Sequence, residues 1–158
     1  MLLKELIETL SEKNIYGNED IDISGVEYDS RKVKEGSVFV AVRGLVDDGH
    51  LFVGDALKRG AKAVIVNKGF PAINTVIQDN PVTTVEVPDS RKALALVANK
   101  FYGFPSKSLR LIGITGTNGK TTTSYLIESI LRQDGRRTGL IGTINCHIGD
   151  RIVASSKT

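Results

Sequence analysis

At 158 residues, with 41% hydrophobic and 25% charged side chains, the chain has a globular composition and is long enough for one ordinary domain or two small ones. The net charge of +3 comes from Lys and Arg scattered along the chain rather than in runs, which argues against a nucleic-acid-binding surface. The single cysteine, Cys146, excludes an intrachain disulfide and is typical of the reducing cytosol; we expect it to be a small buried hydrophobe.

The N-terminus shows no targeting signal. Its first apolar stretch carries Glu5, Glu8 and Glu12 and lacks a small-residue cleavage site, so it does not match a signal peptide. No apolar run approaches the roughly 20 residues that a membrane-spanning helix needs. We therefore expect a cytoplasmic protein, a monomer that acts on small molecules and has no nucleic-acid or membrane partner.

Along the first two-thirds of the chain, helical and strand patterns alternate, which is typical of an α/β fold. Apolar residues at helical spacing predict helices at residues 2–10, 50–60 and 89–102. Alternating or continuous apolar runs predict strands at residues 21–30, 37–42, 63–66, 74–78 and 83–87.

The third of these helices has the clearest boundaries. Asp89 or Ser90 is a suitable N-cap, and Gly103 with Pro105 ends the pattern. The stretch "GFPSKS" that follows lies between two complete patterns, so we place a boundary there between domains 1–106 and 107–158. The buried stripe of the helix is expected to be Leu94, Val97, Ala98 and Phe101.

After this boundary, "LRLIGIT" at residues 109–115 is a nearly continuous apolar run. Such a run is typical of a strand buried on both faces of a parallel sheet. The loop "GTNGK" then leads into a helix at residues 121–135, and a second strand is expected at residues 138–144. The order predicts a β-loop-α-β unit.

The stretch "GITGTNGKTTTS" at residues 113–124 combines the parts of a phosphate site. A strand that ends in a glycine-rich turn and opens a helix presents unpaired backbone N–H groups at the positive end of the helix dipole. Gly116 and Gly119 permit close approach of a ligand, because they carry no Cβ. Lys120 supplies a mobile charge for the β and γ phosphates, and the Thr121 hydroxyl is placed to ligate Mg²⁺.

Two observations complicate this interpretation. The common phosphate loop reads G-x-x-x-x-G-K-[ST], whereas the residue five positions before Gly119 is Ile114. A surface turn capped by threonine would by itself explain Asn118 and Gly119. The strand before the loop and the helix after it favour the nucleotide site, but the spacing alone does not identify the class of enzyme.

The residues "GITGTNGKTTTSYLIES" resemble the ATP-binding loop of the Mur ligases, the cytoplasmic enzymes that add amino acids to the peptidoglycan precursor. The segment "YDSRKVKEGSVFVAVRGLVDDGHLFVGDALKRGAKAVIV" is similar to the uridine-nucleotide-binding domain of the members that add the third residue or the D-Ala-D-Ala dipeptide. The threonine of "TGT" and the ending "GLIGTINCHIGDRIVASSKT" favour the third-residue-adding group. The resemblance implies an N-terminal mixed α/β domain that binds the uridine nucleotide, followed by the first β-α-β unit of a P-loop ATPase domain.

The resemblance also implies two sets of contacts. The ATP-binding loop corresponds to Gly116, Thr117, Asn118, Gly119, Lys120, Thr121, Thr122 and Thr123. The UDP-linked substrate is implied to contact Tyr28, Ser30, Leu45, Val46, Asp47 and Thr158. Within the loop, Lys120 is implied as the catalytic residue and Thr121 as the ligand of Mg²⁺.

The tripeptide Asp-Ser-Arg occurs twice, so it identifies nothing by itself. The copy at residues 89–91 is explained as a helix N-cap, whereas the copy at residues 29–31 lies between two strands and keeps the functional interpretation. We interpret His50 as a residue at the start of a helix rather than a catalyst, because no carboxylate or metal-ligand spacing around it indicates a base or a ligand.

The reaction that the resemblance implies is acyl activation. ATP phosphorylates the D-Glu side-chain carboxylate of UDP-MurNAc-L-Ala-D-Glu, and the amine of meso-diaminopimelate or L-lysine attacks the acyl phosphate to give an amide, ADP and phosphate. The loop would contribute positioning and neutralisation of charge at the γ-phosphoryl group. The residues present do not select between the two diamino acids.

The chain ends soon after the loop, so we expect a truncated piece of a longer ligase with poor activity of its own. Three alternatives stay open: a ligase that adds D-Ala-D-Ala, a relative of folylpolyglutamate synthase, and a non-catalytic nucleotide-binding module. The folate enzymes resemble GTNGKGS at the loop, whereas here Thr121 and Thr122 follow Lys120, which favours the Mur ligases.

Overall fold

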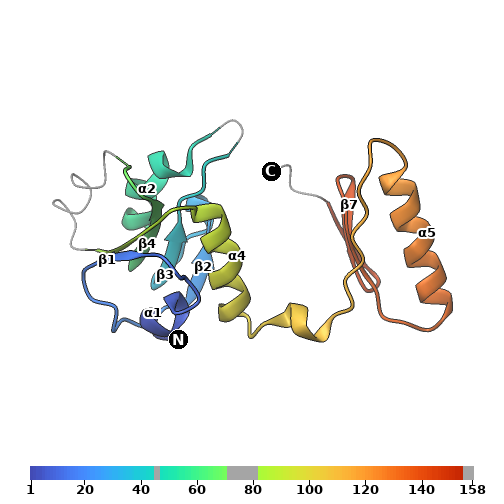
Figure 1. The fold of residues 1–158 in the computed structure, drawn as a ribbon, viewed down its shortest axis with the longest axis horizontal. Helices are drawn as coiled ribbons and strands as arrows, with labels where there is room; N and C mark the ends of the chain where they lie inside the picture. Colours follow the sequence, from blue (N-terminus) through green and yellow to red (C-terminus); the bar gives the residue numbers. More distant parts are fainter. Residues whose placement is uncertain (45–46, 71–81, 155–158) are drawn as a thin grey trace. The chain divides into compact units, whose positions relative to one another are not determined.

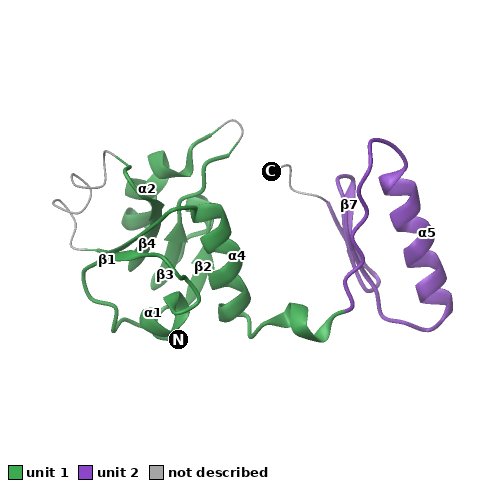
Figure 2. Ribbon diagram, in the orientation of Figure 1, with its two compact units in different colours: residues 1–109 green, residues 110–158 purple. Residues whose placement is uncertain are grey.

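The structure is a computed structural model that describes residues 1–44, 47–70 and 82–154. The chain divides into two compact units, residues 1–109 (unit 1) and residues 110–158 (unit 2), which Figure 2 shows in green and purple. Each unit has its own sheet. The predicted strand at residues 74–78 lies outside the described residues.

The sheet of unit 1 has five strands in the order β1-β5-β4-β3-β2. Four of them run parallel, and β1 pairs antiparallel with β5 at one edge. Four predicted strands are thus confirmed, although the first is much shorter than expected, and the sequence pattern missed β1. The strands are β1 (Asn14–Tyr16), β2 (Gly25–Glu27), β3 (Ser37–Val40), β4 (Ala63–Asn67) and β5 (Thr83–Val87).

Helices cover both faces of this sheet, as Figure 1 shows. Because side chains alternate between the faces of a strand, Val38 and Val40 pack with α1 (Leu3–Ile7) and α4 (Ser90–Phe101). Phe39 points to the other face and packs with α2 (Val53–Lys58). The continuous apolar runs of the inner strands therefore reflect burial on two sides, as the predicted α/β class requires.

Helix α4 begins and ends as the sequence predicts. The Asp89 carboxylate accepts the backbone N–H of Lys92 at 3.0 Å, which caps the first turn. Gly103, with a φ of 73°, follows the last turn. Of its predicted buried stripe, Val97 is buried, Leu94 and Phe101 are half-buried and pack against the core, and Ala98 is half-buried; Ala93, which was not predicted, is buried as well.

Unit 2 consists of one long helix and a small antiparallel sheet. Helix α5 (Lys120–Gln133) is followed by β6 (Gly139–Ile141), β7 (Asn145–Ile148) and β8 (Arg151–Ala154), which pair in that order. The strand predicted at residues 138–144 is therefore confirmed only in its first half, and the β7-β8 hairpin was not predicted. Cys146, expected to be buried, is half-buried in β7.

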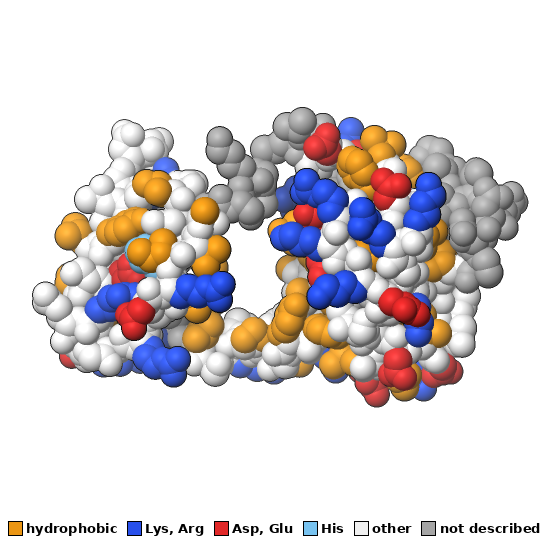
Figure 3. Space-filling model, turned by 180° about the vertical axis from the view of Figure 1, so that it is seen from behind, with side chains coloured by type: hydrophobic (Ala, Val, Ile, Leu, Met, Phe, Trp, Pro, Cys, Tyr) orange, Lys and Arg blue, Asp and Glu red, His pale blue; other side chains and the backbone are white. Residues whose placement is uncertain are grey.

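The strand predicted at residues 109–115 is wrong. These residues form no ladder with any described strand, and Leu111 and Ile112 are 73% and 54% exposed. A strand buried on both faces needs parallel neighbours on its two edges, and the described sheet of unit 2 holds only the antiparallel β6-β7-β8 set. Figure 3 shows further hydrophobic side chains at the surface of unit 2. Among the described helices, none is long and apolar enough to cross a membrane.

Candidate functional site

The glycine-rich loop before α5 adopts a backbone that requires its glycines. Gly116 has a φ of 147° and Gly119 a φ of 76°, values that side-chain-bearing residues rarely adopt. Gly119 is the N-cap of α5, and its carbonyl accepts the first helical hydrogen bond, from the N–H of Thr123 at 2.9 Å. The loop residues Gly116, Thr117, Asn118 and Gly119 are all exposed to solvent.

The backbone N–H groups of this loop are free to bind a ligand. Within the described parts of the chain, the amides of residues 117–122 donate to no protein acceptor. They lie in the loop and first turn of a helix of 14 residues, at the positive end of its dipole. A phosphate or another small anion is the ligand that such an arrangement binds.

Lys120 is turned back onto the loop. Its Nζ donates to the carbonyl oxygen of Gly116 at 2.5 Å and to that of Thr117 at 3.3 Å. Both contacts are exposed to solvent, so the ammonium can exchange them for another acceptor at little cost. The positive charge therefore already lies beside the free amides.

The threonines after Lys120 are arranged on the first turn of α5. Thr121 is half-buried, Thr122 and Thr123 are exposed, and the Ser124 hydroxyl donates to the Thr121 carbonyl at 2.7 Å. No group of three or more His, Cys, Asp or Glu side chains in the described ranges could hold a metal ion. Mg²⁺ commonly takes one or two protein ligands beside phosphates and water, and a lone Thr121 hydroxyl fits that pattern.

Two of the predicted nucleotide contacts of unit 1, Tyr28 and Ser30, lie where a parallel strand ends. Tyr28 and Ser30 follow the carboxyl end of β2; the Tyr28 ring is 50% exposed and Ser30 begins the short helix η1 (Ser30–Lys32). Parallel α/β sheets bind ligands outside the carboxyl ends of their strands. Leu45, Val46 and Thr158 lie outside the described residues, so the structure does not place them.

Asp29, between these two residues, organises the turn. Its carboxylate caps η1 by accepting the Arg31 N–H at 3.1 Å and also accepts Nε and a terminal nitrogen of Arg31, each at 2.8 Å. The hydrogen bonds from the Arg31 guanidinium lower the pKa of Asp29 to about 2. The second Asp-Ser-Arg copy is the α4 cap, as expected, and its Ser90 is buried.

A short hairpin follows β3 at the same edge of the sheet. Its stem consists of Val42 to Gly44 paired with Asp47 to Gly49, and it is closed by hydrogen bonds from Gly49 N to Val42 O at 3.0 Å and from Gly44 N to Asp47 O at 2.8 Å. A Cβ on Gly49 would lie 2.7 Å from the Val42 carbonyl oxygen, so only glycine fits. Asp47, a predicted contact, is exposed in this stem.

Sequence reasoning missed the partners of His50, which lies in η2 (Gly49–Phe52), at the start of the helical segment as predicted. Its ring is buried, with Nδ1 2.5 Å from Asp48 Oδ1, while Nε2 accepts the N–H of Asn67 at 2.9 Å. Partial burial raises the pKa of Asp48, but hydrogen bonds from His50 and the charge of Arg43 outweigh it and leave that pKa below its usual value. The sequence signal that could have indicated this contact is the carboxylate of Asp48, two residues before the histidine.

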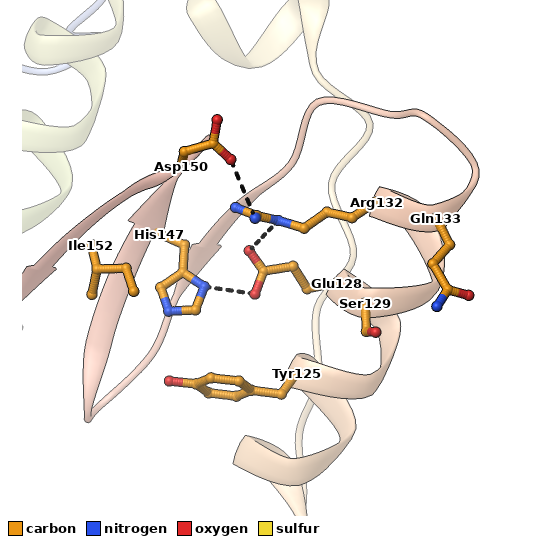
Figure 4. Close-up of a pocket in the computed structure, with 8 residues that line it drawn as sticks. All are labelled: Tyr125, Glu128, Ser129, Arg132, Gln133, His147, Asp150 and Ile152. Carbon is orange, nitrogen blue, oxygen red and sulfur yellow. Dashed lines mark hydrogen bonds and ion pairs between the residues drawn. The ribbon is translucent and has the colours of Figure 1, made fainter.

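Unit 2 has a cavity of about 460 Å³ between α5 and its sheet, which the sequence did not predict. Figure 4 shows Glu128 at its centre, where it accepts His147 Nδ1 at 2.6 Å and pairs with Arg132 at 3.4 Å. Arg132 also reaches Asp150 at 3.5 Å. Lining residues are Tyr125, Glu128, Ser129, Arg132, Gln133, His147, Asp150 and Ile152.

Comparison with known proteins identifies both units. The model "Mur ligase family, catalytic domain" matches residues 22–102, and the model "Mur ligase middle domain" matches residues 114–158. A Clostridium tetani protein named "UDP-N-acetylmuramoyl-L-alanyl-D-glutamate--2,6-diaminopimelate ligase" is 44% identical over 158 residues, which are 100% of this chain and 32% of that protein. A Cytophaga hutchinsonii protein of the same name is 41% identical over 158 residues, again 32% of its length.

The solved structures agree at the level of the family. MurF from Acinetobacter baumannii superposes with a TM-score of 0.60 and 25% identity, covering 84% of this chain and 27% of that one. The chain therefore spans about a third of the length of the curated relatives that it matches.

Proposed function

Since the chain belongs to the Mur ligase family, we propose that it carries the uridine-nucleotide-binding domain and the ATP-phosphate loop of a ligase that adds a diamino acid to UDP-MurNAc-L-Ala-D-Glu. The names of the curated relatives, at 41% to 44% identity, support this substrate rather than that of MurF, whose structures are 25% identical. The diamino acid named in those relatives is 2,6-diaminopimelate. The cytoplasm is the proposed compartment and the monomer the proposed state.

The observation that carries the proposal is the set of free amides at the start of α5 beside the Lys120 ammonium. When bound, ATP would supply the phosphoryl group that activates the D-Glu carboxylate. The chain's own part is to bind the phosphates with the amides of residues 117–122 and to neutralise their charge with Lys120. The Thr121 hydroxyl is the proposed ligand of the accompanying Mg²⁺.

In unit 1, we assign the carboxyl edge of the parallel sheet to the UDP part of the substrate. Tyr28 has an exposed ring that can stack on a base, and Ser30 offers a hydroxyl at the start of η1. Asp47 is exposed in the neighbouring hairpin stem. The two sites would thus lie in different units, one for each substrate that carries phosphates.

The proposal is tested by titrating the chain with MgATP and with UDP-MurNAc-L-Ala-D-Glu in a calorimeter. Replacing Lys120 with Ala removes a charge-assisted contact, so we expect ATP affinity to fall about ten- to a hundredfold while affinity for the UDP compound stays unchanged. Arg137→Ala is the matched control, because Arg137 is an exposed cation of unit 2 beyond the end of α5.

The same titration separates the alternatives. A chain that binds folate in preference to the UDP compound would refute the Mur substrate and support the folylpolyglutamate synthase relative. A chain that binds ATP but neither UDP-MurNAc-L-Ala-D-Glu nor folate would support a nucleotide-binding module instead.

A further inference from the structure

We propose that His50 is a positioning residue, which pins the hairpin stem (Val42–Gly44 paired with Asp47–Gly49) to the carboxyl edge of the unit 1 sheet for binding of the UDP-linked substrate. The inference rests on the function proposed above for the identity of the ligand. The pin itself follows from the hydrogen bonds of His50.

The His50 ring links the stem to the end of β4. Nε2 accepts the backbone N–H of Asn67, the last residue of β4, at 2.9 Å. Since Nε2 accepts, the neutral ring carries its hydrogen on Nδ1 and donates it to Asp48 Oδ1 at 2.5 Å. The same oxygen accepts the His50 N–H at 3.0 Å, so Asp48 is held by two donors.

The link continues to the helix that follows β5. The side-chain oxygen of Asn67 accepts the N–H of Ser90, the first residue of α4, at 2.7 Å. Phe70 packs against the imidazole, with 4.8 Å between the ring centroids. The ring therefore connects the ends of β3, β4 and α4 in a buried position, where its side chain is only 2% exposed.

The groups that this arrangement holds in place are charged and exposed. Arg43 Nε lies 4.0 Å from the second oxygen of Asp48, and the Arg43 side chain is 80% exposed. The Arg43 carbonyl accepts a terminal nitrogen of Arg91 at 2.8 Å, so two arginines meet at the stem. A diphosphate is the part of the substrate that two guanidinium groups attract.

An apolar side chain would fill the same volume without the need to satisfy two ring nitrogens. A fully satisfied buried polar network fixes one conformation of the segment that it holds, which is what a binding site needs from a loop. Gly49 supports this view, because its missing Cβ lets its own backbone lie close to that of Val42, between Asp48 and His50 in the sequence. The three consecutive residues thus act together: Asp48 caps η2, Gly49 allows the close approach to Val42, and His50 holds the stem to β4.

The test compares two substitutions of His50 with a substitution of the other histidine, His147, which lies in unit 2. His50→Leu fills the space but loses both hydrogen bonds of the ring. If the stem then adopts its binding conformation in only about a tenth of the molecules, affinity for UDP-MurNAc-L-Ala-D-Glu should fall about tenfold. His50→Gln offers an amide oxygen to Asn67 and should recover most of that loss. MgATP affinity should stay unchanged in both His50 variants, and affinity for UDP-MurNAc-L-Ala-D-Glu should stay unchanged in His147→Gln.

Hydrogen exchange gives a second measurement that needs no ligand. The amides of Gly44 and Gly49 close the stem, and both should exchange faster in His50→Leu than in the parent chain, while amides of α5 should not change. If His50→Leu does not fold, His50→Gln and Asp48→Asn provide the same comparison with smaller expected losses.

Each outcome has one meaning. Tenfold weaker binding of the UDP compound by His50→Leu, together with faster hydrogen exchange of the stem amides, supports the inference. Unchanged affinity in His50→Leu overturns the inference and leaves the proposed function standing. If the parent chain does not bind the UDP compound, the proposed function of unit 1 fails, and the inference fails with it. Unchanged stem exchange would show that His50 is not the pin.

Discussion

The two units bury their apolar side chains to very different degrees. In unit 1, Phe39, Val64 and Val66 are fully buried between a sheet and its helices. In unit 2, Ile130 of α5 is 66% exposed and Ile141 of β6 is 93% exposed. Unit 1 is therefore held by packing, whereas the described part of unit 2 depends on polar links between α5 and its sheet.

Those polar links centre on one carboxylate. Glu128 is 7% exposed and contacts both His147 of β7 and Arg132. Arg132 in turn donates to the carbonyl oxygen of Gly149 in the β7-β8 turn, and the Tyr125 hydroxyl donates to Asn145. Apolar substitutions should thus be most harmful in unit 1 and polar substitutions in unit 2.

The largest expected effect is that of Phe39→Ala. Removing a fully buried aromatic ring loses its transfer free energy and leaves a cavity, so the free energy of unfolding should fall by about 3–5 kcal/mol. Ile141→Ala is the matched control and should change it by less than about 0.5 kcal/mol. Urea unfolding followed by far-UV circular dichroism measures both. Equal losses would contradict the contrast between the units.

Glu128→Ala should have the next largest effect, and only in unit 2. Without the carboxylate, His147 loses its one described hydrogen-bond partner and Arg132 loses one of its two ion-pair partners. The free energy of unfolding of unit 2 should fall by about 1–3 kcal/mol. Hydrogen exchange of residues 120–154 should quicken while that of the unit 1 core does not. Asp150→Ala is the control: the Asp150 side chain is fully exposed, so its contact with Arg132 is expected to matter far less.

A smaller loss is expected for Asp89→Ala, which removes the N-cap of α4 without touching the apolar layers. The N–H of Lys92 then has no side-chain acceptor, and the free energy of unfolding should fall by about 1 kcal/mol. Asp89→Asn keeps an acceptor and should recover most of the loss. Urea midpoints of the three proteins measure the effect; an unchanged midpoint in Asp89→Ala would exclude a stabilising cap.

The smallest effect concerns the pH dependence of unit 1. The folded pKa of Asp29 is lowered from 3.8 to about 2, so the folded state binds this proton less readily than the unfolded chain. The stabilisation is therefore complete above about pH 4 and is lost as pH falls toward 2. Because Arg31 is exposed to solvent, the contribution should be below about 1 kcal/mol.

Urea midpoints measured between pH 5 and pH 2, for the parent chain and Asp29→Asn, isolate the stabilisation that the Asp29 carboxylate provides. The parent should lose slightly more stability on acidification than the variant. A parent chain that gains stability in this range relative to the variant would show that the sign is wrong.

The sequence predicts most of unit 1 because its signals are local. The apolar run from Val38 to Val40 and the Asp89 cap each predict an element from neighbouring residues, and both predictions are confirmed. The phosphate loop is recognisable for the same reason: its glycines and Lys120 are contiguous. The predicted ATP and UDP contacts themselves stay predictions.

What the sequence does not predict depends on pairing between distant residues. The apolar run at residues 109–115 has a strand pattern, but a pattern does not provide the neighbouring strands that would make it one. Asn67 lies 17 residues after His50, and only the parallel register of β3 and β4 brings the end of β4 to the histidine. The Glu128–His147 contact likewise spans 19 residues and a change of element.

Gly49 sets a limit on how this chain can vary. A methyl group there would press on the backbone of Val42 from 2.7 to 2.8 Å, whereas Gly54, one turn into the same helical segment, has nothing within 4 Å of such a methyl. In a library randomised at both positions and selected for a folded stem, the surviving clones should all encode glycine at position 49. Codon 54 should accept alanine and other helix formers. The backbone geometry therefore requires glycine at position 49, whereas position 54, five residues later, can accept other residues.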